Sequence, residues 1–155
     1  MELHGAVQHP YVLRVSLAAE YAGVEVKPNG FVPQKADKEQ LKDYQARANP
    51  NGQVPCLVTP EGPLSETRSI LRYLARTGKN KTLYGATPFE QAQVDQWLDW
   101  EAKEFSPIFM AYAMPFVGRA EYNKPVHDEY VEDLKKVVKV LNDHLKKRQY
   151  IVGKQ

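Results

Sequence analysis

The sequence has very little cysteine and little excess charge of either sign. Cys56 is the single cysteine among 155 residues, so no disulfide can form within the chain, as is usual in a reducing compartment. The formal net charge of +2 gives no strong electrostatic attraction to nucleic acid or to an anionic membrane. No hydrophobic run approaches the roughly 20 residues of a membrane span, and residues 1–6 lack the features of a signal peptide. We therefore expect a cytoplasmic protein that contacts neither membrane nor nucleic acid.

Metal-ligating residues are also sparse. His4, His127 and His144 have no histidine or cysteine neighbour at the spacing of a metal site, so the sequence predicts no metal. Cys56 follows a proline in an apolar stretch and is expected to fill the core rather than to act as a reactive thiol. The residues that are present, 43% hydrophobic and 26% charged, have the balance of a folded globular protein.

Local patterns divide the chain into two parts and a connection. Residues 1–78 alternate between short strand-like and helix-like stretches, whereas residues 87–155 are helical throughout. Residues 79–86 are polar and aperiodic, and we expect them to form a linker. The predicted order in the first part is strand, helix, strand, helix, two strands joined by a hairpin, and helix. These elements are expected over residues 1–5, 10–22, 24–26, 41–48, 54–58, a partner strand after residue 62, and 66–77.

Helix starts and stops are well marked in the second part. Thr87 and Glu90 have the spacing of a capping box, with a proline at the first helical position between them. Pro107 and Pro115 are expected to kink or end helices, and Pro125 is expected to begin another. An amphipathic stripe of leucine and valine follows Pro125. The pattern predicts an all-helical second domain.

A proline inside an apolar stretch marks the first candidate binding element. Pro55 cannot donate a hydrogen bond to a neighbouring strand, so the strand over residues 54–58 must be an edge or bend there. If the Val54–Pro55 bond is cis, the Val54 backbone turns outward and can pair with an extended peptide, as an added strand does. A trans bond, which most internal prolines have, is the alternative.

The start of a predicted helix supplies the second candidate element. Free N–H groups and the positive end of the helix dipole attract a carboxylate there, and the Thr67 hydroxyl can add a donor. The Glu66 carboxylate, one residue earlier, can hold an ammonium group. A zwitterionic head group beside an extended backbone describes the γ-glutamyl end of glutathione. The alternative is that the Thr67 hydroxyl only caps the helix, as hydroxyls at helix starts usually do.

Together, these two elements resemble the glutathione transferase family. Residues 49–55, Asn-Pro-Asn-Gly-Gln-Val-Pro, are similar to the family's stretch before its cis-proline. Residues 64–74 look like its Glu-Ser-x-Ala-Ile helix start, with threonine for serine, and residues 17–24 resemble its first helix. The resemblance implies a thioredoxin-like α/β N-terminal domain followed by an all-α C-terminal domain, of which residues 87–155 would be an incomplete part. It also implies that glutathione, as substrate or ligand, is bound by Gln53, Val54, Pro55, Glu66 and Thr67.

The resemblance leaves two further features of the family to be placed. Members hold the glycine carboxylate of glutathione with a basic or amide residue near the second helix, for which Lys38, Gln40 and Lys42 are candidates. Members also commonly pair through the third and fourth helices, here over residues 66–77 and 88–103. We therefore expect a homodimer.

The first turn departs from the family pattern. Members activate the glutathione thiol with a tyrosine, serine or cysteine at this turn, whereas His9 takes that position here and Tyr11 follows two residues later. These two residues are the catalytic candidates, as hydrogen-bond donors to the thiolate. Two alternatives stay open, because His9 could cap the helix or face solvent, and a slip of two residues at the turn would shift the catalytic donor. Enzymatic activity is accordingly left undecided.

The second part of the chain resembles one group of proteins within this family. Residues 121–124, the lysine-rich helix after them and residues 150–153 look like the gamma subunits of eukaryotic translation elongation factor 1, in which a transferase-like domain works as a scaffold. Members continue well beyond the stretch that resembles residues 150–153, so we expect this chain to be part of a longer protein. The resulting hypothesis is a docking module with other elongation factor subunits as partners. The alternative is a free-standing glutathione transferase that conjugates glutathione to electrophiles.

Overall fold

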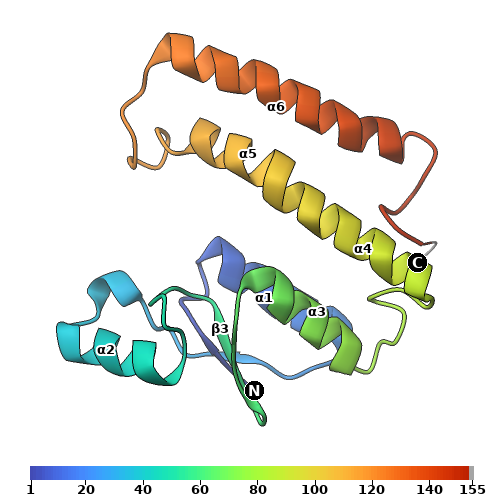
Figure 1. The fold of residues 1–155 in the computed structure, drawn as a ribbon. Coiled ribbons are helices and arrows are strands. Elements are labelled where there is room, and N and C mark those ends of the chain that lie inside the picture. The colour runs from blue at the N-terminus through green and yellow to red at the C-terminus, as the bar shows by residue number, and fades with distance from the viewer. Residues whose placement is uncertain (154–155) are drawn as a thin grey trace. The chain divides into compact units, whose positions relative to one another are not determined.

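The computed structural model describes residues 1–153, and the chain separates into two units between Ala86 and Thr87 (Figure 1). The segment 79–86, expected to be a linker, lies within the first unit. There Tyr84 is buried, and its hydroxyl accepts a hydrogen bond from Arg76 at 2.8 Å. Burial of this aromatic ring anchors a segment that its polar composition alone would leave loose. Among the described residues, no helix is long and apolar enough to cross a membrane.

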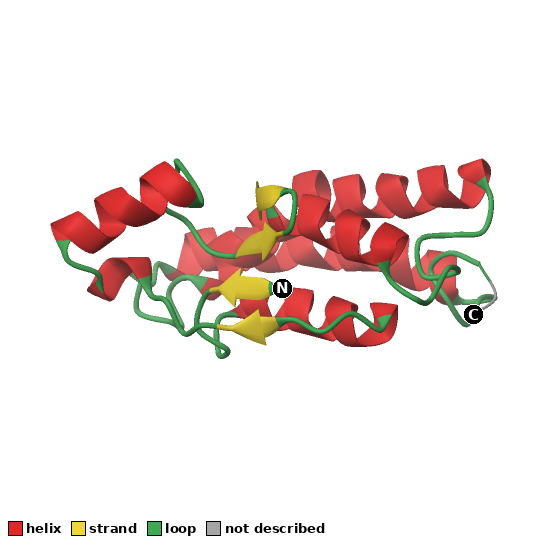
Figure 2. Ribbon diagram, turned by 90° about the horizontal axis from the view of Figure 1, so that it is seen from below, coloured by secondary structure: helices red, strands yellow, loops and turns green. Residues whose placement is uncertain are grey.

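A four-stranded sheet forms the centre of the first unit. Its strands are β1 (Glu2–His4), β2 (Lys27–Pro28), β3 (Cys56–Thr59) and β4 (Gly62–Ser65), in the order β2-β1-β3-β4. Strands β1 and β2 are parallel, whereas β3 runs antiparallel to both β1 and β4. The strands lie side by side in Figure 2. The turn between β3 and β4 is the predicted hairpin, in which Thr59 pairs with Gly62.

Strand β2 lies further along the chain than its predicted position at residues 24–26. Its register is set by β1, because Lys27 pairs with Glu2 and the Lys27 N–H donates to the Met1 carbonyl at 3.0 Å. Val24 and Val26 nevertheless pack against the core. The alternation of apolar and polar residues over 24–26 therefore reflects which side chains are buried. Pairing with β1 decides which residues form the hydrogen-bonded strand.

Three helices and a short 3-10 turn complete the first unit. Helix α1 (Pro10–Ala22) ends at Gly23, whose φ of 68° suits a residue without a Cβ. Helix α2 (Lys38–Arg47) begins with a capping box formed by Asp37 and Gln40, and the 3-10 turn Pro33–Lys35 precedes it. Helix α3 spans Thr67–Thr77. The order of elements is the predicted one, and the architecture is that of a thioredoxin-like domain.

The core of the first unit joins the sheet to α1 and α3. Completely buried side chains come from β1, β3 and these two helices, and the large aliphatic ones among them are Leu3, Leu57, Val12, Val15, Ile70 and Leu74. Full burial of each such aliphatic side chain contributes about 1.5–3 kcal/mol. This shared core holds both helices against the sheet. It therefore also fixes the turns at which the two helices begin.

The second unit is helical, as predicted. Helix α4 (Pro88–Trp100) begins with the Thr87–Glu90 capping box and continues through a π-helical turn, Glu101–Phe105, into α5 (Ser106–Ala113). Helix α6 spans Lys124–Leu145. Aromatic contacts pack α6 against its neighbours: the ring centroids of Trp97 and His144 lie 4.4 Å apart in a tilted arrangement, and those of Tyr112 and His127 lie 4.8 Å apart in a stacked one.

Candidate functional site

A cavity of about 360 Å³ opens in the first unit beside the starts of α1 and α3. Its volume lies within the range of small-molecule binding sites. All seven predicted site residues line it: His9, Tyr11, Gln53, Val54, Pro55, Glu66 and Thr67. The lining also contains five residues outside the predicted set: Arg14, Gln34, Asn49, Gly52 and Arg68. Segments more than fifty residues apart in the sequence thus meet at one site.

One wall of the cavity is the segment that leads into β3. The Val54–Pro55 peptide bond is cis, which is the alternative that turns the Val54 backbone outward. Pro55 is buried, whereas Val54 is half-buried and borders the cavity. Gly52, with φ of 65°, turns the chain into this segment at an angle that a residue with a Cβ rarely adopts.

A second wall is the start of α3. Glu66 directly precedes the helix with φ of 68° and ψ of 112°, an unfavourable backbone conformation for a residue with a side chain. Its side chain is exposed and makes no capping hydrogen bond to the helix. Thr67 is the first helical residue, so its hydroxyl lies beside the N–H groups that the first turn leaves without an intrahelical acceptor. A carboxylate group and a site for a carboxylate therefore adjoin each other at this wall.

The start of α1 forms the third wall. His9 is the residue before the helix, but its side chain makes no capping hydrogen bond, and the ring is half-buried. The rings of His9 and Tyr11 lie 5.7 Å apart, and the Arg14 guanidinium carbon lies 5.4 Å from the centre of the Tyr11 ring. An imidazole, a phenol and a cation therefore border the same part of the cavity.

The candidates for the glycine carboxylate do not border the cavity. Lys38, Gln40 and Lys42 lie on α2, and the Gln40 side chain is engaged in the capping box with Asp37. Gln34, in the 3-10 turn before α2, borders the cavity instead. No sequence motif marks Gln34, because its position depends on how the loop before α2 folds back toward the sheet.

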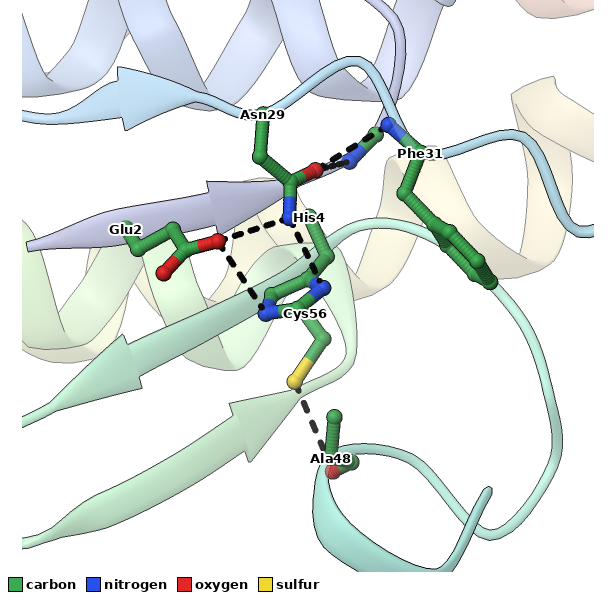
Figure 3. A network of polar contacts seen from close by, with 7 residues as sticks. Glu2, His4, Asn29, Phe31, Ala48 and Cys56 are labelled. Atoms are coloured by element: carbon green, nitrogen blue, oxygen red, sulfur yellow. Dashed lines mark hydrogen bonds and ion pairs between the residues drawn. The ribbon is translucent and has the colours of Figure 1, made fainter. Parts of the chain in front are cut away.

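A polar network ties the loop after β2 to β1 (Figure 3). The Asn29 amide nitrogen lies 2.8 Å from a Glu2 carboxylate oxygen and 3.0 Å from His4 Nδ1, and the Asn29 side-chain oxygen accepts from the backbone N–H of Phe31 at 3.0 Å.

Cys56 is fully buried, and burial raises the pKa of its thiol. The predicted core role of Cys56 is therefore confirmed. No metal-binding group of three or more histidine, cysteine or acidic side chains occurs within residues 1–153.

Comparison with known proteins identifies the family. A family model described as "Glutathione S-transferase, N-terminal domain" matches residues 1–76. Glutathione S-transferase 4 of Zea mays is 36% identical over 159 residues, which cover 99% of this chain and 70% of that protein. This chain belongs to the glutathione transferase family. The predicted resemblance and fold class are both confirmed.

Solved glutathione transferases share the fold over nearly the whole chain. Glutathione S-transferase I bound with lactoylglutathione superimposes with a TM-score of 0.79 at 31% identity, over 97% of this chain and 73% of that one. Glutathione transferase F2 from Populus trichocarpa gives a TM-score of 0.84 at 26% identity, over 99% of this chain and 74% of that one.

A second group of relatives consists of translation factors. Probable elongation factor 1-gamma 1 of Arabidopsis thaliana is 33% identical over 138 residues, and Elongation factor 1-gamma of Prunus avium is 31% identical over 153 residues. These matches cover 88% and 97% of this transferase-family chain. The chain spans about a third of the length of these relatives, 33% and 35% respectively.

Proposed function

We propose that this chain is a glutathione-binding domain that serves as a docking module within a translation elongation factor 1 complex. The observation that carries the binding half is the cavity, which brings the cis-proline wall and the start of α3 together around one space. The observation that favours the docking half is the similarity to elongation factor 1-gamma proteins over most of the chain.

The γ-glutamyl end of glutathione fits the start of α3. The Glu66 carboxylate would hold the ammonium group, while the Thr67 hydroxyl and the N–H groups of the first helical turn would hold the α-carboxylate. Hydrogen bonds to charged groups contribute about 1.5–3 kcal/mol each. The Val54 backbone at the adjacent wall would pair with the cysteinyl residue, with Gln53 and Pro55 flanking it.

The glycine end would lie toward the opposite side of the cavity. Gln34 offers an amide to its carboxylate, and the two arginines of the lining, Arg14 and Arg68, outnumber Glu66. The lining therefore carries a net positive charge. Glutathione at neutral pH carries two carboxylates and one ammonium group, so the charge of the lining suits it.

Calorimetry with reduced glutathione tests the binding half. Wild-type protein should bind, and Glu66→Gln should weaken binding about tenfold or more, because it removes the charge and keeps the shape of the side chain. Thr77→Val is a matched control, since Thr77 lies at the other end of α3 and its hydroxyl donates to the Tyr73 carbonyl. Absence of binding at millimolar glutathione, or equal affinity in Glu66→Gln, would reject the proposed pocket.

A pull-down from cytosol with the intact protein as bait tests the docking half. Recovery of the nucleotide-exchange subunit or of the tRNA-carrying GTPase, with or without glutathione, is the expected result. Recovery of neither partner, together with strong conjugating activity, would reject the docking role.

A cytoplasmic location and the pairing of two copies through α3 and α4 stay predictions. Light scattering at micromolar concentration should give twice the chain mass of 17.7 kDa.

A free-standing glutathione transferase is the second candidate, because His9 and Tyr11 border the cavity and would be the hydrogen-bond donors to a thiolate. A free thiol has a pKa near 8.5, and lowering it by about two units requires about 2.7 kcal/mol of preferential thiolate stabilisation. One hydrogen bond to a thiolate from Tyr11 or His9 supplies about 1.5–3 kcal/mol, so a single donor can provide most of this requirement.

Conjugation of glutathione to a chloro-nitrobenzene measures this activity directly. The double variant His9→Ala/Tyr11→Phe should lose it, while retaining affinity for glutathione, because the head-group residues are untouched. Full activity in the double variant would remove both residues from the mechanism.

A further inference from the structure

Two buried side chains converge on one backbone carbonyl beside the candidate site. The Tyr44 hydroxyl donates to the Gln53 carbonyl at 2.7 Å, and the Asn49 side-chain amide donates to the same oxygen at 2.8 Å. Tyr44 and Asn49 are 5% and 4% exposed, so water cannot replace either donor cheaply. The Gln53 carbonyl has two acceptor sites, and both are occupied.

These two bonds also fix the orientation of the next N–H group. The Gln53 carbonyl and the Val54 N–H belong to the same planar peptide unit. This unit is trans, and the cis bond is the next one along the chain, between Val54 and Pro55. In a trans unit the two groups point in opposite directions. Holding the carbonyl toward the buried Tyr44 and Asn49 therefore aims the Val54 N–H away from them.

The two donors are themselves held in place. The Asn49 side-chain oxygen accepts from the Asn51 N–H at 3.1 Å, which closes the turn before Gln53. The Tyr44 ring packs against the rings of Phe31 and His4, with centroid distances of 4.5 and 5.4 Å. Phe31 and His4 are in turn held by hydrogen bonds to the Asn29 side chain (Figure 3). Burial raises the pKa of Tyr44, so its hydroxyl stays protonated and remains a donor at neutral and moderately alkaline pH.

We propose that Tyr44 and Asn49 are positioning residues of the glutathione pocket, which hold the Gln53–Val54 peptide in the orientation that pairs with an extended ligand backbone. This inference rests on the proposed glutathione binding. Neither residue needs to touch the ligand. Tyr44 lies outside the cavity lining and acts through the Gln53 carbonyl.

Tyr44→Phe is the sharpest test, because it removes one donor and keeps the ring between Phe31 and His4. Tyr84→Phe is the matched control: Tyr84 is 3% exposed and its hydroxyl is hydrogen-bonded, but it does not border the cavity. In ligand-free protein, the ¹⁵N order parameter of Val54 should fall from about 0.85 toward about 0.6 in Tyr44→Phe and stay unchanged in Tyr84→Phe. An unchanged order parameter in Tyr44→Phe would overturn the inference.

Titration with two ligands separates positioning from general damage. Glutathione should bind Tyr44→Phe about fivefold more weakly than wild type, the effect of one hydrogen bond. A glutathione analogue in which a methylene group replaces the cysteinyl carbonyl cannot accept a hydrogen bond from the Val54 N–H, so its weaker binding should be nearly insensitive to the substitution. Equal losses for both ligands would indicate a structural defect and overturn the inference.

Asn49→Asp is a second variant with a stronger expected effect. It keeps the acceptor for the Asn51 N–H but places an anionic oxygen against the Gln53 carbonyl, so glutathione affinity should fall more than in Tyr44→Phe. Affinity equal to wild type in this variant would also overturn the inference. If the wild-type protein fails to bind glutathione, the proposed function is rejected, whereas the order parameter of Val54 still decides whether Tyr44 orients this peptide.

Discussion

Glu66 carries backbone strain at the candidate site, and its replacement should reveal it. It is the one non-glycine residue with a positive φ among residues 1–153. Holding a residue with a Cβ in such a conformation costs about 1–3 kcal/mol. Glycine avoids this cost but loses about 0.5–1 kcal/mol more backbone entropy on folding than alanine. The difference predicts that Glu66→Gly is about 1 kcal/mol more stable than Glu66→Ala.

Glu66→Ala is the matched control because it removes the same carboxylate and keeps the Cβ. Urea unfolding should give a higher midpoint for the glycine variant with an unchanged slope, and its thermal midpoint should be about 3 °C higher. Both variants should bind glutathione weakly, since both lack the carboxylate proposed to hold the ammonium group. Equal stability of the two variants would refute the argument, because the strain would then be absent from the folded state.

Three further predictions concern the stability of the two units. Leu74 is fully buried, so Leu74→Ala should cost about 3 kcal/mol in urea unfolding, whereas Leu17→Ala, at a residue that is 53% exposed, should cost less than about 0.5 kcal/mol. A Cβ on Gly78 would lie 2.4 Å from a backbone oxygen at the end of α1, so Gly78→Ala should lower the thermal midpoint, and an unchanged midpoint would show that the helix can shift. Hydrogen bonds from two lysine side chains, Lys139 first, lower the pKa of Asp143 from 3.8 to about 2. A carboxyl group with a lowered pKa stabilises the fold above its unfolded-state pKa, and this contribution should disappear as the pH falls from about 4 to 2. NMR titration of Asp143 checks the value, which should rise in Lys139→Met.

Local chemistry accounts for most of what could be predicted about the fold. Helix α1 begins at Pro10 and ends at Gly23, and α4 begins at the Thr87–Glu90 capping box, as the residues at these positions predicted. The β3–β4 hairpin follows from its turn residues in the same way. Such signals lie within a few residues of the feature that they specify, so one sequence is enough to find them. Strand β2 was misplaced because its pairing partner lies some 25 residues away.

The head-group part of the site was also visible in the sequence, since Glu66 and Thr67 are adjacent and the cis-proline stretch has a recognisable composition. The family resemblance, rather than periodicity, placed these two segments at one site. The positive φ of Glu66 had no sequence signal, because glutamate does not favour that conformation and only the surrounding fold imposes it.

The sequence by itself determined the order of the elements and the chemistry at the start of α3. Only the tertiary structure decided that Gln34, and not Lys38 or Lys42, borders the cavity, because the path of the loop before α2 sets which side chains reach it. It also decided that Tyr44 and Asn49 meet on the Gln53 carbonyl. Convergence of this kind depends on distances through space between separate elements, and periodicity and turn chemistry describe only neighbours along the chain.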